Sequence, residues 1–215
     1  MLSPLRLVVR LYRLWLAGVA GYLIGSILTA DLASRVANLG NDDAVDLRAT
    51  GSGNPGAGNA FANLGKGWGA AVLVGDLLKG GAGAQAGRMI AGDGGAYFAG
   101  TASVIGHCFP AWTEFRGGKG VATSAGTTLV CFPAFIPLEV AGVLGSFATT
   151  KSAGKTTAIV CGLFVISAYT WRRFGWRNAW GPTPTSALPL YALATSGLMA
   201  YKFLTAPKHM GDRPK

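Results

Sequence analysis

Residues 14–33 read LWLAGVAGYLIGSILTADLA, an apolar run that is interrupted only by Ser26, Thr29 and Asp31 near its far end. A helix of about 20 apolar residues is long enough to cross the hydrocarbon core of a bilayer. Half of the 215 residues are hydrophobic and only 13% are charged, whereas soluble domains usually carry about 25% charged residues. The sequence therefore predicts an integral membrane protein and excludes the ordinary water-soluble classes.

Further apolar runs lie at residues 67–90, 96–112, 121–147, 158–171 and 188–204. Pro133 and Pro137 break the run at 121–147, so we expect two short helices there rather than one span. The expected fold is all-α: a polytopic membrane protein of about five to seven short transmembrane helices with glycine-rich cytoplasmic active-site loops. Residues 1–215 are taken as a single integral membrane domain, with an interfacial amino-terminal segment at 1–13 and a polar carboxyl-terminal tail at 205–215.

The chain is basic, with a net charge of +10. The basic residues gather at the ends of apolar runs, so we expect anionic membrane lipids and phosphorylated substrates as partners, and no nucleic acid. Arg6, Arg10 and Arg13 favour a cytoplasmic amino terminus, whereas Lys66 and Lys119 favour cytoplasmic loops on the other side of one crossing. Because phosphorylated metabolites are cytoplasmic, we place the loops inside and the terminal arginines flat on the membrane surface.

Residues 51–59 read GSGNPGAGN and are called the first glycine loop below. Glycine permits the positive φ angles with which successive backbone N–H groups converge on an oxyanion, so this loop is predicted to bind an anion. Gly154, Lys155 and Thr156 match the end of a P-loop, but Thr149 stands where that motif requires glycine. Nucleotide binding by that motif is therefore excluded.

Residues 116–123 read RGGKGVAT and are called the second glycine loop. Lys119 can meet a phosphate group as a point charge. The alternative interpretation is a basic loop that merely flanks a membrane span.

Asp76 and Lys79 stand three residues apart inside the run at 67–90, on one face of a helix. Ionisable residues within membrane helices usually mark a functional site. The alternative is an ion pair that only neutralises itself.

The order and spacing of these segments resemble the bacterial acyl-phosphate-dependent glycerol-3-phosphate acyltransferase family. The resemblance covers about residues 21–126. It is carried by residues 51–57 with Asn59, Asp76 with Lys79 and Gly80, Gly106 and His107 with Phe109 and Pro110, and residues 117–123.

The resemblance implies an enzyme of the bacterial inner membrane whose active site opens on the cytoplasmic side. It implies that the substrates are acyl phosphate and glycerol 3-phosphate, that the products are lysophosphatidic acid and phosphate, and that no metal, nucleotide or other cofactor takes part. An acyl phosphate already carries a good leaving group, so its reaction calls for positioning and charge stabilisation more than for a strong nucleophile.

In that scheme the first glycine loop holds the donor headgroup and Lys119 binds phosphate charge. The acceptor hydroxyl must lose a proton; His107 is one candidate base because histidine titrates near neutral pH, and a phosphate oxygen of the donor is the other. The catalytic candidates are Lys119 and His107. The candidates for substrate binding are Ser52, Gly53, Asn54, Gly56, Asn59, Lys79, Arg116, Gly117, Gly118 and Thr123.

Several positions depart from the family pattern. Gly58 stands where the family has threonine, Ala62 stands where it has arginine, and the family's final His-Arg-x-Asn segment is absent. A cationic contact to the acceptor phosphate is therefore expected to be missing, unless Lys151, Lys155 or Arg48 supplies it.

These departures leave three alternatives to the leading hypothesis. One is a paralogue that acylates another acceptor, and a second is a non-catalytic subunit that binds a membrane protein partner. The third is an anion carrier, against which the lack of paired half-helix repeats argues.

Overall fold

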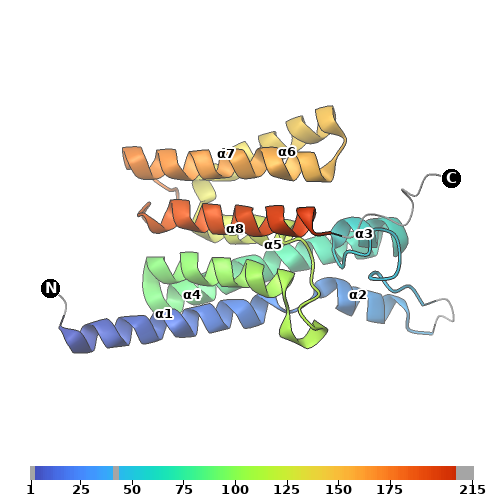
Figure 1. Ribbon diagram of the computed structural model, residues 1–215, viewed down its shortest axis with the longest axis horizontal. Coiled ribbons are helices and arrows are strands. Elements are labelled where there is room, and N and C mark those ends of the chain that lie inside the picture. Colours follow the sequence, from blue (N-terminus) through green and yellow to red (C-terminus); the bar gives the residue numbers. More distant parts are fainter. Residues whose placement is uncertain (1–2, 41–43, 207–215) are drawn as a thin grey trace.

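The structure is a computed structural model that describes residues 3–40 and 44–206. Across these residues the chain forms helices joined by loops, without a strand (Figure 1), so the all-α expectation is confirmed. The helices are α1 (Pro4–Gly25), α2 (Thr29–Ala37), α3 (Ala57–Asn63), α4 (Lys66–Cys108), α5 (Val121–Cys131), α6 (Ile136–Thr150), α7 (Ala153–Phe174) and α8 (Ala187–Leu204), with the 3-10 turns η1 (Ala111–Thr113) and η2 (Pro133–Phe135).

The longest element, α4, is a helical hairpin rather than one straight helix. Its helical conformation is interrupted at Ala91 and at Gly92, where φ is +67°. The two arms pack closely, because a Cβ atom on Gly87 or Gly95 would overlap the carbonyl group of the other residue. Counting each arm once, the described residues pass seven times between the two ends of the molecule, which is the upper limit of the sequence prediction.

Three segments of the described chain are long and apolar enough to span a membrane: Pro4–Ala37, Pro133–Thr150 and Ala153–Phe174. The first begins at Pro4, where the side chain of Ser3 accepts a hydrogen bond from the backbone of Arg6. The segment predicted to be interfacial is therefore continuous with the first spanning helix.

The proline break is placed as expected. Helix α5 ends at Cys131, Pro133 begins η2, and Pro137 lies in the first turn of α6, where a missing N–H group costs no helical hydrogen bond. The segment between the first apolar run and α4 is partly helical, because α2 extends to Ala37 and residues 57–63 form α3.

Small residues let the backbones of α1 and the second arm of α4 touch. A Cβ atom on Gly21 or Gly25 of α1 would overlap the backbone of Ala99 or Ser103, and one on Gly106 would overlap the carbonyl of Tyr22. Packing of this kind is typical of membrane helices, whose association depends on close van der Waals contact. It fixes the carboxyl end of α4, and therefore His107, against α1.

The molecule has two basic ends. The glycine loops, α2, α3 and the last turn of α8 lie at one end, and the amino terminus lies at the other (Figure 1). At the amino-terminal end, Arg13 donates to the carbonyl of Ile90 at 2.5 Å and Arg88 donates to the carbonyl of Trp180 at 3.1 Å. These bonds tie α1, the turn of α4 and the connector between α7 and α8 together.

Candidate active site

The first glycine loop is organised around Asn59, the third residue of α3. Its side-chain oxygen accepts from the backbone N–H of Ser52 at 3.0 Å, and its amide group donates to the carbonyls of Leu47 (2.7 Å) and Thr50 (3.0 Å). Gly51 and Gly53 have φ angles of +59° and +63°, as the sequence predicted for glycines in this loop. Asn59 is buried and acts here by holding the loop closed.

Four backbone N–H groups of this loop have acceptors within it or directly before it. Gly53 donates to the carbonyl of Thr50 (3.1 Å), Gly56 donates to the carbonyl of Asn54 (2.9 Å), and Asn54 donates to the hydroxyl of Ser52 (3.4 Å). Together with Ser52, whose N–H binds Asn59, four N–H groups of the loop therefore have acceptors within it or at Thr50, directly before it. In this arrangement the loop offers a ligand its side chains rather than these four N–H groups.

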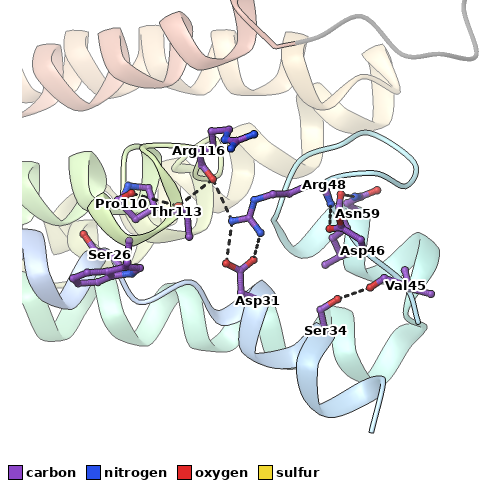
Figure 2. A network of polar contacts seen from close by, with 12 residues as sticks. Ser26, Asp31, Ser34, Val45, Asp46, Arg48, Asn59, Pro110, Thr113 and Arg116 are labelled. Atoms are coloured by element: carbon purple, nitrogen blue, oxygen red, sulfur yellow. Dashed lines mark hydrogen bonds and ion pairs between the residues drawn. The ribbon is translucent and has the colours of Figure 1, made fainter. Parts of the chain in front are cut away.

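Arg48, three residues before the first glycine loop, connects α2 to the second glycine loop. Figure 2 shows its guanidinium group between the carboxylate of Asp31 on α2, which it binds at 2.5 and 2.9 Å, and the backbone carbonyl of Arg116, which it reaches at 3.2 Å. The side chain of Arg116 is exposed and pairs with Glu114. The structure therefore uses the backbone of Arg116, and not its charge, to position the second glycine loop.

The second glycine loop lies flat against the carboxyl end of α4. Gly117 donates to the carbonyl of Cys108 (3.2 Å) and Gly118 donates to the carbonyl of His107 (3.1 Å). These bonds satisfy carbonyls that a helix end leaves without partners. A Cβ atom on Gly118 would overlap the ring of His107, so this contact requires glycine.

Asp76, Lys79 and His107 form a buried charged cluster. The Nζ atom of Lys79 lies 2.8 Å from Oδ1 of Asp76, 2.8 Å from Nδ1 of His107 and 2.7 Å from the carbonyl of Ile27. Thr29 donates to the same Asp76 oxygen at 2.6 Å. The predicted pair of Asp76 and Lys79 is therefore present, and all three N–H donors of the Lys79 ammonium group are used within the chain.

Lys79 and His107 share one hydrogen bond in this cluster. With Lys79 as an ammonium group, which can only donate, Nδ1 of His107 accepts and the ring proton lies on Nε2. Nε2 faces the Cα atom of Gly118 rather than a cavity.

A small polar cavity of about 100 Å³ brings both glycine loops together with the end of α8. Its lining residues are Ser52, Gly53, Asn54, Pro55, Gly117, Lys119, Lys202, Thr205 and Ala206. Lys119 lies over the ring of Phe203 at 4.4 Å. Burial lowers the pKa of Lys119, and the charge of Lys202 lowers it further.

Five of the predicted site residues line this cavity: Ser52, Gly53, Asn54, Gly117 and Lys119. The other seven do not line it. His107, Lys79 and Asn59 form the hydrogen bonds described above, and Gly118 packs against His107. Arg116 lies at the surface, Gly56 precedes α3, and Thr123 is fully buried in α5. Sequence reasoning did not find Lys202. The available signal was a lysine in the last turn of an apolar run that returns to the end of the molecule where the glycine loops lie.

An apolar cavity of about 230 Å³ lies between α5, α6 and α7. Val121 and Met199 are among its lining residues, with Thr128, Glu139, Val143 and Val160. Val121 belongs to the second glycine loop, and Met199 lies one helical turn before Lys202. Residues that are close in sequence therefore line the two cavities.

Comparison with known proteins agrees with this geometry. The glycerol-3-phosphate acyltransferase family profile matches residues 15–210. A glycerol-3-phosphate acyltransferase of Nitrobacter winogradskyi is 41% identical over 134 residues, which cover 62% of this chain and 66% of that protein. One from Gloeobacter violaceus is 39% identical over 160 residues, which cover 71% of this chain and 75% of that protein.

Solved structures show the same fold. The crystal structure of PlsY (YgiH), an integral membrane glycerol 3-phosphate acyltransferase, in its glycerol 3-phosphate form superposes with a TM-score of 0.70 and 28% identity, covering 91% of this chain and 94% of that one. The lysophosphatidic acid form gives a TM-score of 0.68. On the profile match and these relatives, the chain belongs to the glycerol-3-phosphate acyltransferase family.

Proposed function

We propose that this protein transfers the acyl group of an acyl phosphate to a hydroxyl of glycerol 3-phosphate, which gives lysophosphatidic acid and inorganic phosphate. The observation that carries the proposal is the cavity in which the two glycine loops and two lysines meet at one end of the membrane helices. Family membership and the substrate and product named for the solved relative support it.

Lys119 is the residue we assign to the charge that develops in the reaction. The acceptor oxygen bonds to the acyl carbon, the bond from that carbon to the phosphate oxygen breaks, and the electron pair leaves with phosphate. An ammonium group placed beside that oxygen stabilises the growing negative charge. Ser52 and Asn54, which line the same cavity, supply neutral hydrogen bonds to the phosphate oxygens.

The acceptor proton goes to a phosphate oxygen of the donor in this scheme. His107 is buried, its Nδ1 is bonded to Lys79, and it does not line the polar cavity. We therefore assign His107, with Asp76 and Lys79, a positioning role. The cluster fixes the carboxyl end of α4. The second glycine loop donates hydrogen bonds to the carbonyls of His107 and Cys108 at that end, so the cluster determines the position of Lys119.

The apolar cavity between α5, α6 and α7 is the place we propose for the donor's acyl chain. It begins at Val121, two residues from Lys119, so a chain that enters it leaves its phosphate at the polar cavity. Burial of each methylene group stabilises such a complex by about 0.8 kcal/mol. The acyl chain is then the main source of donor affinity.

We also propose that the polar cavity opens to the cytoplasm at the inner membrane of a bacterium. Both substrates are phosphorylated, and phosphorylated metabolites are cytoplasmic. The fold supports this arrangement because it gathers both loops at one end of the helices (Figure 1).

The test is an assay of the purified, lipid-reconstituted protein with palmitoyl phosphate and glycerol 3-phosphate. We expect lysophosphatidic acid and inorganic phosphate in equal amounts, and no product when acyl-coenzyme A replaces the acyl phosphate. Because Ala62 stands where the family has arginine, the assay includes a panel of other phosphorylated alcohols. A faster reaction with one of them than with glycerol 3-phosphate would identify a paralogue with a different acceptor.

A further inference from the structure

The missing arginine at position 62 raises the question of which cation meets the acceptor phosphate. Arg48 is already engaged, because its guanidinium group binds both oxygens of Asp31 and the carbonyl of Arg116. Lys151 and Lys155 are exposed on the surface and do not line the polar cavity. Within the described part of the chain, Lys202 is the cation that shares this cavity with Lys119.

We propose that Lys202, in the last turn of α8, supplies the acceptor-phosphate contact that the family takes from the position of Ala62. The inference rests on the proposed function and adds a specificity-determining residue to it. It also explains how glycerol 3-phosphate is retained as acceptor although the family's arginine and its carboxyl-terminal His-Arg-x-Asn segment are absent.

The position of Lys202 is defined by its contacts. Its Nζ atom donates to the carbonyl of Cys108 at 3.1 Å and lies 4.8 Å from the centre of the Phe109 ring. An ammonium group has three donors, and this is the one hydrogen bond of Lys202 within the described residues. The side chain is therefore held at the cavity with donors left for a ligand.

The charge balance of the cavity calls for an anion. Lys119 and Lys202 are both about half buried, and no carboxylate is among the nine described residues that line the cavity. Two like charges facing one small space repel each other, and a phosphate dianion between them turns that repulsion into two attractive contacts. Each contact is of the charge-assisted kind.

The acceptor depends on this contact more than the donor does. Acyl phosphate gains affinity from its chain in the apolar cavity, whereas glycerol 3-phosphate has no apolar part and is held through its phosphate and hydroxyl groups. Loss of Lys202 is therefore expected to raise the KM for glycerol 3-phosphate while leaving the KM for acyl phosphate nearly unchanged.

The experiment compares the wild type with Lys202→Ala, Lys202→Arg and Lys155→Ala in steady-state assays that vary one substrate at a time. For Lys202→Ala we expect the glycerol 3-phosphate KM to rise about ten- to a hundredfold, the range for one charge-assisted hydrogen bond. Lys202→Arg should keep most of the affinity because it keeps the charge. Lys155→Ala, which removes an exposed charge on the neighbouring α7, should change KM less than twofold.

Calorimetric binding of glycerol 3-phosphate to the same variants separates this inference from the proposed function. Binding that weakens in Lys202→Ala supports the inference even if acyl phosphate is not turned over. An unchanged glycerol 3-phosphate affinity in folded Lys202→Ala, or an effect confined to the acyl phosphate KM, would overturn it. Thermal unfolding of each variant checks that loss of the Cys108 contact has not unfolded the protein, and Lys202→Met provides a variant of similar length without charge.

Discussion

At the scale of single residues, the site combines groups that hold its shape with groups that face its ligand. The first kind forms its hydrogen bonds within the protein and comprises Asn59, Arg48 and the buried charged cluster. The second kind lines the cavity and comprises Lys119 and Lys202. The sequence motifs alone do not separate the two kinds. A glycine-rich motif predicts the loop's backbone, but only the positions of Asn59 and Thr50 reveal where its N–H groups are directed.

Lys119→Ala is expected to lower kcat/KM by at least tenfold more than Lys66→Ala, since Lys119 lines the cavity and Lys66 is exposed at the start of α4. Both substitutions remove one positive charge from the same end of the molecule, so Lys66→Ala controls for general surface potential. Initial rates with both substrates measure the difference. Equal losses of kcat/KM in the two variants would mean that Lys119 contributes only to membrane topology and not to the reaction.

Gly53→Val is expected to abolish turnover of acyl phosphate while the protein remains folded. The φ of Gly53 is +63°, which a β-branched residue adopts only with strain, and a Cβ atom there would lie 3.2 Å from the carbonyl of Arg48. Gly58→Ala is the matched control, because Gly58 has an ordinary φ and nothing within 4 Å of its Cβ position. Undiminished turnover in Gly53→Val would remove this loop from the mechanism.

Ala62→Arg is expected to lower the KM for glycerol 3-phosphate, because it adds the cation that the family pattern has at this position. Ala62 is exposed on α3, so the longer side chain does not have to enter a packed core. In a Lys202→Ala background the same substitution should restore part of the lost affinity. A tight wild-type KM that Ala62→Arg makes worse would show that position 62 has no part in acceptor binding.

At the scale of helices and loops, much of the fold is visible in the sequence. The apolar runs, the break at Pro133 and the spacing of Asp76 and Lys79 all have counterparts in the structure, because each depends on a local periodicity or on proline geometry. The contribution of α8 to the site could not be predicted from the sequence, because it depends on how the last helix packs. Lys202 comes close to Cys108 only through that packing.

Val143→Trp is expected to shorten the range of acyl chains that the enzyme accepts. Val143 on α6 lines the apolar cavity, so a larger side chain there reduces the room for a donor chain. Val140→Trp is the control, because Val140 is exposed on the same helix and does not line the cavity. Rates with a series of acyl phosphates measure the effect; a parallel loss at every chain length would mean that the chain lies elsewhere.

At the scale of the whole molecule, charge does not decide the orientation in the membrane. Arg13, Arg88 and Arg177 belong to the end that holds the amino terminus, while Lys66 and Lys119 belong to the end with the glycine loops (Figure 1). The positive-inside rule requires a difference between the two sides, and here both are basic. The proposed orientation therefore rests on the proposed substrates, since phosphorylated metabolites are cytoplasmic.

With the polar cavity open to the cytoplasm, we expect a cysteine at position 177 to face the periplasm and one at position 66 to face the cytoplasm. Both positions are exposed in the structure, at opposite ends of the helices.

Of the native cysteines, Cys108 and Cys131 are buried and Cys161 is partly exposed, so Cys161→Ala provides the background. In intact cells, a maleimide reagent that cannot cross the inner membrane should label Arg177→Cys at once and label Lys66→Cys only after the membrane is permeabilised. Five passages, the two arms of α4 and then α5, α6 and α7, separate position 66 from position 177, and this odd number places them on opposite sides. The two labels must therefore exchange together if the orientation is inverted. Labelling of Lys66→Cys in intact cells would put the polar cavity outside, where the phosphorylated substrates of the proposed reaction are not supplied, and the proposed function would then fail together with the orientation.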